Sequence, residues 1–167
     1  MKRIQGGEGM KALECVNPRL QKWVVRWDIQ PHYNEEGEQM GVDYYEHWFT
    51  HKPSLEEIKE VVTAGYNALV DQRILSGFVW KDMPVWLSTE NQFNYKAAYD
   101  LAVQTAGASL PVLFKFGTAD APVYYSFSDL GDFADFYTQA MAYINQALAE
   151  GWSLKDSIDW SVYESLL

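Results

Sequence analysis

The sequence predicts an α+β fold: short antiparallel hairpins packed against three main helices, with an N-terminal aromatic-rich β-hairpin. Three observations support this prediction. Residues 21–30, QKWVVRWDIQ, alternate between apolar and polar side chains, which is typical of a half-buried strand. Three long stretches carry apolar residues at helical spacing. Pairs of short apolar runs flank turn residues between those stretches, as hairpins do.

The first part of the chain is expected to hold a loosely ordered segment and then a hairpin. Residues 1–20 have weak periodicity and contain GGEG, with no strand before it and no helix after it, so a phosphate-binding loop is not indicated. Residues 21–53 are predicted to form a β-hairpin appendage, whose second strand, 42–51, is rich in aromatic residues. The remaining residues, 54–167, are predicted to form the α+β core module.

The core module is predicted to begin with a helix from Ser54 to about Ser76. Ser54 and Glu57 have the spacing of a capping box, in which each side chain accepts from the other residue's backbone N–H. Gly77 is expected to end this helix, because glycine tolerates the left-handed conformation of a helix cap. Two short strands should follow in FVWKDMPVWL. The apolar stripe of the helix consists of Leu55, Ile58, Val62, Gly65, Tyr66 and Leu69.

A second helix is predicted to begin at the polar stretch STENQ. Thr89 with Gln92 fits another capping box, and Ser88 is an alternative cap. Asn91 faces the apolar side of this helix and Phe93 the polar side, against the pattern. We therefore expect Asn91 to fix a neighbouring loop by hydrogen bonding, or else to contact a ligand. The apolar face consists of Tyr95, Ala98, Tyr99, Ala102 and Ala106.

The last part of the chain is predicted to contain a hairpin and the longest helix. Two strands flank a turn that carries Gly117 and Asp120. Ser128 is expected to cap a helix over about 129–150, whose apolar stripe is the strongest in the sequence. Gly151 is expected to end that helix, and a short final helix is expected to start near Ser153.

Composition restricts the expected partners. The net charge is −10, so the chain repels phosphate backbones and anionic bilayers, and neither nucleic acid nor a membrane is an expected partner. No apolar run approaches the ~20 residues that a membrane span needs. Cys15 is the single cysteine, which excludes an internal disulfide. The basic N-terminal residues precede no apolar stretch, so a signal peptide is not expected.

The three histidines do not suggest a metal site. His47 and His51 share one face of a predicted strand but lie roughly 13 Å apart at ~3.3 Å per residue, which is too far to share one ion. His32 could approach them across the hairpin. The sequence contains no nucleophile elbow, Walker loop or dinucleotide-binding fingerprint. We therefore expect no metal, no cofactor and no catalytic residue.

Three carboxylates near the start of the longest helix leave one alternative open. Asp129, Asp132 and Asp135 could supply the acid pair of a glycoside hydrolase. Acidic residues in the first turns of a helix also complement its dipole, and this structural role is the one we expect.

Aromatic residues make up 16% of the chain, more than usual, so they either stabilise the sheet as cross-strand pairs or form a binding surface. Both faces of the predicted N-terminal hairpin carry them. An open hairpin face could stack on a sugar, so a carbohydrate- or ligand-binding module is the alternative function. The residues expected to contact a ligand or partner are Trp23, Trp27, Tyr45, Trp48, Asn91 and Phe93.

Residues 76–160 contain SGFVWKDMPVWLSTENQFNYKAAYDLA, then LPVLFKFGTADAPVYYSFSDLGDF, then a long helix that ends in EGWSLKDSID. This order of motifs resembles a family of phage and prophage domains of unknown function that is associated with tail-fibre and tail-fibre-assembly proteins. The resemblance implies a non-enzymatic structural or assembly protein. It implies other phage structural proteins, or self-association, as partners, and the host cytoplasm or the virion as the location.

Overall fold

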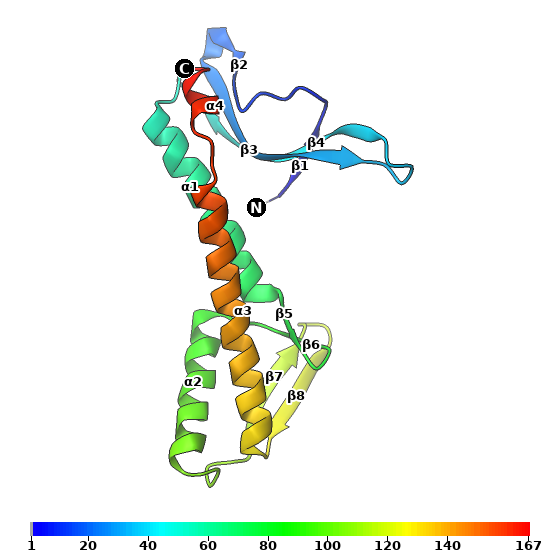
Figure 1. Ribbon diagram of the computed structural model, residues 1–167, viewed down its shortest axis with the longest axis vertical. Helices are drawn as coiled ribbons and strands as arrows, with labels where there is room; N and C mark the ends of the chain where they lie inside the picture. The colour runs from blue at the N-terminus through cyan, green and yellow to red at the C-terminus, as the bar shows by residue number, and fades with distance from the viewer. Residues whose placement is uncertain (1) are drawn as a thin grey trace. The chain divides into compact units, whose positions relative to one another are not determined.

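The computed structural model describes residues 2–167 and confirms the α+β class (Figure 1). Its chain divides into two compact units: unit 1 runs up to Ala68 and includes Leu154–Leu167, and unit 2 is Leu69–Ser153. Among residues 2–167, no helix is both long and apolar enough to cross a bilayer. The elements are β1 (Ile4–Gly6), β2 (Leu13–Asn17), the short 3-10 helix η1 (Pro18–Leu20), β3 (Lys22–Tyr33), β4 (Gln39–Phe49), α1 (Leu55–Ser76), β5 (Phe78–Trp80), β6 (Met83–Val85), α2 (Thr89–Gln104), β7 (Val112–Gly117), β8 (Pro122–Phe127), α3 (Leu130–Asp156) and α4 (Ser161–Glu164).

Unit 1 contains an antiparallel sheet of four strands in the order β1-β4-β3-β2. Strands β3 and β4 form the predicted hairpin. The edge strands β1 and β2 come from residues 1–20, where the sequence predicts only a loosely ordered segment. Strand β1 has three residues, and the pairing of β2 with β3 shifts register between Cys15 and Asn17, so neither strand shows an alternating pattern.

Helix α1 can lie close to β3 in unit 1 because it carries a glycine there. Trp27 on β3 is 3% exposed, and a Cβ placed on Gly65 would lie 2.5 Å from Cζ2 of its ring. The predicted apolar stripe of α1 is therefore confirmed at Gly65, which has no side chain and so leaves room for the Trp27 ring. From the other end of the chain, the Tyr163 hydroxyl donates to the backbone oxygen of Arg26 at 2.8 Å.

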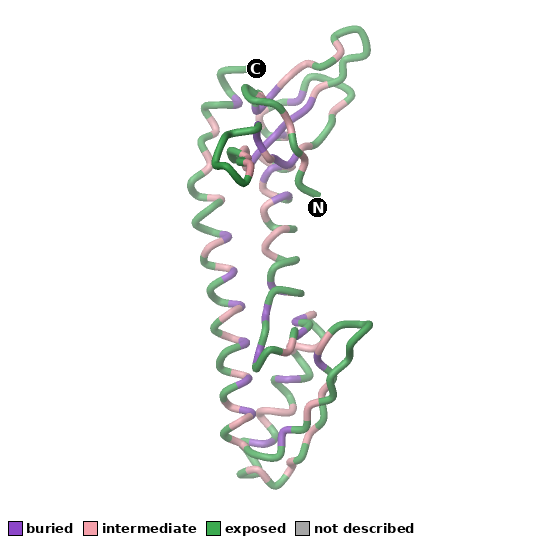
Figure 2. The backbone as a smooth tube through the Cα atoms, turned by 90° about the vertical axis from the view of Figure 1, so that its right-hand side faces the viewer, coloured by how far each residue is buried: buried purple, intermediate pink, exposed green. Residues whose placement is uncertain are grey.

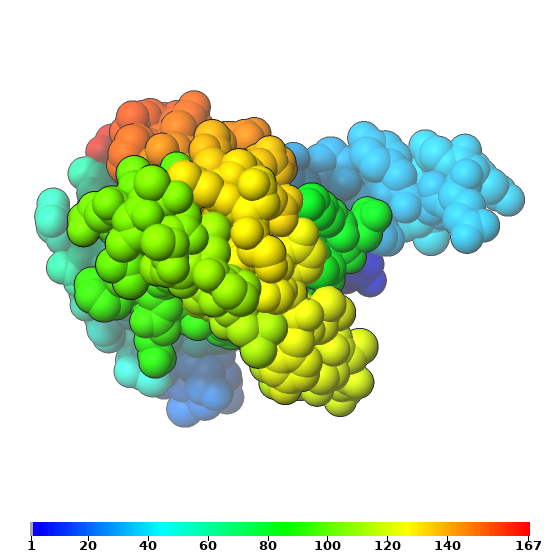
Figure 3. All heavy atoms as spheres, turned by 90° about the horizontal axis from the view of Figure 1, so that it is seen from below, coloured from blue at the N-terminus to red at the C-terminus, as the bar shows by residue number. Residues whose placement is uncertain are grey.

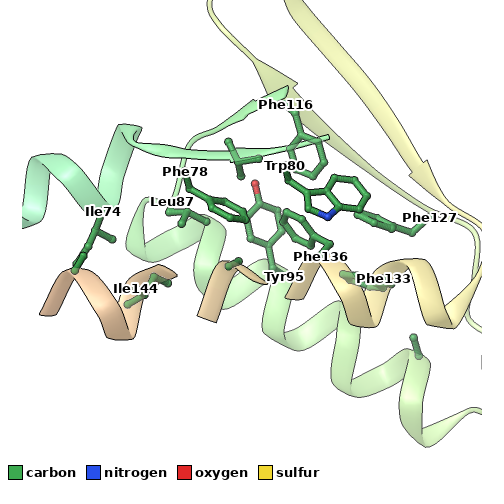
Figure 4. Close-up of a cluster of buried hydrophobic side chains, with 14 residues drawn as sticks. Ile74, Phe78, Trp80, Leu87, Tyr95, Phe116, Phe127, Phe133, Phe136 and Ile144 are labelled. Carbon is green, nitrogen blue, oxygen red and sulfur yellow. The ribbon is translucent and has the colours of Figure 1, made fainter. Parts of the chain in front are cut away.

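Unit 2 is built around a cluster of aromatic rings (Figure 4). Phe136 of α3 is fully buried, and its ring centroid lies 5.2 Å from that of Trp80, 5.1 Å from Tyr95 and 5.2 Å from Phe116. Most of these pairs meet edge to face or tilted, as ring quadrupoles favour. Helices α2 and α3 and the hairpins β5–β6 and β7–β8 all contribute rings, so the cluster joins the elements of the unit.

The predicted helix starts are correct in place and partly wrong in the capping residue. For α2, the alternative cap Ser88 is confirmed and Thr89 is not: the Ser88 backbone is extended and its Oγ accepts from Asn91 N–H at 3.2 Å. For α3, Asp129 rather than Ser128 caps the helix, because its Oδ1 accepts from Asp132 N–H at 2.9 Å. In both cases the residue directly before the first helical turn takes the role.

The predicted end of the longest helix is wrong. Helix α3 continues through Gly151 to Asp156, and buried positions recur along one side of it (Figure 2). A Cβ on Gly151 would lie 2.4 Å from Cγ2 of Val70 on α1. Gly151 is therefore a close-packing residue, and the residues predicted to start a separate helix at Ser153 belong to α3.

Helix α1 ends where predicted, but for a different reason. It begins with the predicted capping box: Glu57 Oε2 accepts from Ser54 N–H at 2.8 Å, and Ser54 Oγ accepts from Glu57 N–H at 3.3 Å. It ends at Ser76, yet Gly77 does not have the predicted left-handed conformation. A Cβ on Gly77 would lie 2.2 Å from the Tyr143 hydroxyl oxygen and 2.7 Å from the backbone oxygen of Arg73, so its role is close packing.

The capping box predicts how stability depends on pH. Hydrogen bonds from Ser54 N–H, from His51 and from the Ser54 hydroxyl lower the pKa of Glu57 from 4.5 to about 2. A lowered folded-state pKa stabilises the fold above the unfolded value, and this stabilisation is lost as the pH falls from 4.5 towards 2. We expect the NMR signal of the Glu57 carboxyl carbon to titrate near pH 2.

Urea denaturation at pH 7 and at low pH provides the corresponding stability test. Glu57→Gln should lower the denaturation midpoint at pH 7 and reduce its dependence on acid, whereas Glu56→Gln should keep the dependence of the unaltered chain. A Glu57 carboxyl that titrates near pH 4.5 would contradict this account of the cap.

Candidate functional site

The four hairpin aromatics predicted as a binding platform lie on both faces of the sheet. Trp27 pairs with Tyr45 across β3 and β4, and Val24 pairs with Trp48. Directly paired residues share a face of the sheet, and successive residues of a strand lie on opposite faces. Trp48, which pairs with Val24, therefore lies on the opposite face from Trp23, Trp27 and Tyr45. The structure therefore does not bring the four side chains together.

Burial separates these aromatics further. Trp27 and Tyr45 stack with centroids 6.1 Å apart and are 3% and 8% exposed, so this pair is part of the core of unit 1. Trp48 is 48% exposed, and its Nε1 donates to Glu46 at 2.8 Å. Trp23 is half-buried. Of the four, only Trp48 offers an open ring, so these residues do not favour a multi-ring sugar platform.

Each of the three histidines contacts a neighbouring side chain that is not a histidine. His32 Nδ1 lies 3.1 Å from Asp43 Oδ2, and His51 Nε2 lies 2.8 Å from Glu57 Oε1. The His47 ring packs edge-on against Phe49. Within residues 2–167, no three His, Cys, Asp or Glu side chains are grouped so that they could hold a metal ion.

The three carboxylates at the start of α3 each contact a neighbour within unit 2. Besides the Asp129 cap, Asp132 Oδ2 accepts from the Tyr125 hydroxyl at 2.6 Å, and its other oxygen pairs with Lys81. Burial alone would raise the pKa of Asp132, but the hydrogen bonds from Lys81 and Tyr125 hold it below its usual value. Asp132 is therefore ionised at neutral pH and bound to a hydroxyl and an ammonium group.

Asp135 accepts a hydrogen bond from a core tryptophan. The indole Nε1 of Trp80, a residue that is 1% exposed, donates to Asp135 Oδ2 at 3.0 Å. This bond and a second one from Gln139 lower the pKa of Asp135. The carboxylate thus satisfies a buried donor that would otherwise have no partner.

Substitutions at Asp135 should separate this structural role from a role that needs charge. Asp135→Asn keeps an acceptor oxygen for the Trp80 indole and should shift Tm only slightly. Asp135→Leu leaves the buried N–H without a partner and should lower Tm by several degrees. Thermal unfolding followed by near-ultraviolet circular dichroism measures both, and equal losses in the two variants would contradict the role.

The two predicted contact residues of unit 2 differ in exposure. Asn91 Nδ2 donates to the backbone oxygen of Trp86 at 2.8 Å, which is the loop-fixing bond expected from the sequence. Gln92 assists by donating to the backbone oxygen of Leu87 at 2.7 Å. Phe93 is 70% exposed and is free to contact a partner.

Sequence reasoning missed a cavity of about 590 Å³ in unit 2, next to Asn91. Its walls come from the end of α1, the joint between β6 and α2, and the β7–β8 turn. Trp86 and Lys115 lie on its lining. The sequence pattern gives no sign of this role, because each residue is expected to be an exposed residue of a strand. The single indication in the sequence was Asn91, which breaks the helical pattern of α2 and for which a ligand contact was an alternative expectation.

Comparison with known proteins identifies a family but no individual relative. The profile of the family described as Domain of unknown function (DUF4376) matches residues 57–166. No curated protein and no solved structure matches the chain.

Proposed function

The chain belongs to the DUF4376 family, and on that premise we propose that it is a non-enzymatic structural or assembly protein of prophage origin, linked to the phage tail or tail fibre. The family description states no function. The phage setting is taken from the resemblance of residues 76–160 described above, and it implies a location in the host cytoplasm or the virion.

One observation carries the non-enzymatic part of the proposal. The polar residues that could have formed a reactive centre in unit 2 hold the fold together. Ser88 caps α2, Asn91 fixes the loop before it, Asp129 caps α3, and Asp132 and Asp135 bind side chains of the hairpins β5–β6 and β7–β8. Such groups supply shape and rigidity to a module whose role is to bind other chains.

Exposed apolar side chains on α2 support contact with a partner chain. Phe93 is 70% exposed and Leu101 is 52% exposed, and eight residues of helix place them on the same side. Figure 3 shows α2, in light green, at the surface of unit 2. We propose that the partner is another phage structural protein or a second copy of this chain.

Two experiments test the proposal together. Size-exclusion chromatography with light scattering should show an oligomer, or a tagged chain expressed in a phage-producing host should retain a virion component. Phe93→Glu should weaken whichever association is seen, whereas Asn145→Glu, at an exposed position of α3, should not. A chain that stays monomeric and retains no virion component would overturn the proposal.

Glycan binding by the hairpin aromatics is the alternative function. Because Trp48 alone among the four predicted residues presents an open ring, we expect no hits on a glycan array and no change in tryptophan fluorescence when glycans are added.

A further inference from the structure

The cavity of about 590 Å³ in unit 2 has the composition of a ligand site. In Figure 1 the β7–β8 turn lies beside the β5–β6 hairpin, and both contribute to its walls. The lining includes Pro84, Val85, Trp86, Asn91, Lys115 and Phe116. Small-molecule sites are typically concave, mostly apolar and supplied with a few polar groups, and this set matches that description.

The apolar part of the cavity provides a floor and a rim. Val85 and Phe116 are each 2% exposed and belong to the aromatic core, so they form a fixed floor. Trp86 is 51% exposed and leaves part of its indole open to a bound group, and Pro84 adds a second rigid surface. A flat ring or a short hydrocarbon group would be desolvated between them.

The charged residues of the lining indicate which charge a ligand would carry. The chain carries 23 acidic and 13 basic residues, yet no acidic residue lines this cavity. Its one charged residue is Lys115, which forms no ion pair within residues 2–167. An ammonium group without a carboxylate partner, beside an apolar surface, favours an anionic group at that edge of the cavity.

Hydrogen bonds fix the polar part of the walls before any ligand binds. Asn91 Nδ2 is held by the backbone oxygen of Trp86, and Thr118 Oγ1 accepts from Ala121 N–H at 3.1 Å. Gly117 has a φ of +80°, and a Cβ there would lie 2.3 Å from the backbone oxygen of Ala121, so the turn needs glycine. A site whose walls are already ordered loses little entropy on binding.

We propose that this cavity binds a small organic anion in which a ring or short hydrocarbon group is joined to a carboxylate. The apolar group lies against Trp86 and Pro84, and the carboxylate lies within reach of Lys115 Nζ. The inference concerns the cavity alone and goes beyond the proposed structural role, because a bound anion requires no phage partner.

A matched pair of probes tests the charge preference. 4-Phenylbutyrate and 4-phenylbutylamine share the same ring and chain but carry opposite charges. In ¹⁵N-resolved NMR titrations of the full chain, 4-phenylbutyrate should shift the amide signals of residues 85, 86 and 115–119, with an affinity about tenfold above that of the amine. Shifts confined to other residues, equal affinities, or no shift with either probe would overturn the proposal.

Two variants distinguish the contribution of Lys115 to the affinity from that of the Trp86 ring. Lys115→Gln should lower the affinity for 4-phenylbutyrate several-fold without weakening the amine, because the like-charge repulsion is removed, whereas Trp86→Ala should weaken both probes. Lys96→Gln is the matched control, because Lys96 is an exposed lysine of unit 2 that pairs with Asp100 outside the cavity. Circular dichroism establishes that each variant folds, and an unchanged affinity in Lys115→Gln would count against the assignment.

Discussion

Phe136→Ala is expected to lower the free energy of unfolding of unit 2 by about 3–5 kcal/mol, the usual cost of removing a fully buried phenylalanine ring. Its ring lies among those of Trp80, Tyr95, Phe116 and Phe127, which come from four different elements (Figure 4). A cavity there removes contacts from all of these elements at once. Urea denaturation, with hydrogen exchange followed peptide by peptide, measures the loss and assigns it to unit 2.

Phe93→Ala is the matched control for this substitution. It removes the same ring from a side chain that is 70% exposed in the same unit, so the change should stay within about 0.5 kcal/mol. If both variants lost similar stability, the aromatic cluster would not be the main source of stability in unit 2.

Gly65→Val is expected to destabilise unit 1 by about 3 kcal/mol, because α1 cannot keep its place against β3 when a side chain fills the space of the Trp27 ring. Any Cβ on Gly65 overlaps that buried ring, and the two γ-methyl groups of valine enlarge the overlap. Higher helix propensity offsets part of the cost, at most about 1 kcal/mol relative to glycine. Hydrogen exchange should show faster opening of β3 and of the first turns of α1.

Ala64→Val controls for the β-branched side chain. Ala64 is the neighbouring residue of α1 and is exposed, so the same new side chain meets no ring there. Its effect should stay near 0.5 kcal/mol, the difference in helix propensity. A Gly65→Val variant as stable as Ala64→Val would show that the Trp27 ring can move aside without loss.

Local patterns predicted the helices and hairpins of this chain because each has a strong period or an unambiguous start. Ser54 with Glu57 marks the beginning of α1, and the apolar stripe marks the length of α3 up to its last turns. Strands β1 and β2 escaped prediction, because an edge strand of three residues, or one with a register shift, carries no period. Their place in the sheet follows from pairing with β4 and β3, which is non-local.

Glycine shows most clearly what a local pattern cannot decide. Gly77 reads as a left-handed helix cap and Gly151 as a helix end, but both glycines allow close contacts with residues distant in sequence, Tyr143 and Val70. The cavity beside Asn91 was missed for the same reason. Its lining combines segments near residues 76, 85, 91 and 117, and no one segment contains the charge pattern that defines it.

The discontinuity of unit 1 has a consequence for biosynthesis. All of Leu69–Ser153 is translated before Leu154–Leu167, so the four-stranded sheet still lacks Tyr163 when the last residue of unit 2 has been added. The backbone oxygen of Arg26 gains this hydroxyl donor only after another 137 residues have been translated. Unit 1 therefore completes its contacts only after all of unit 2 has been synthesised.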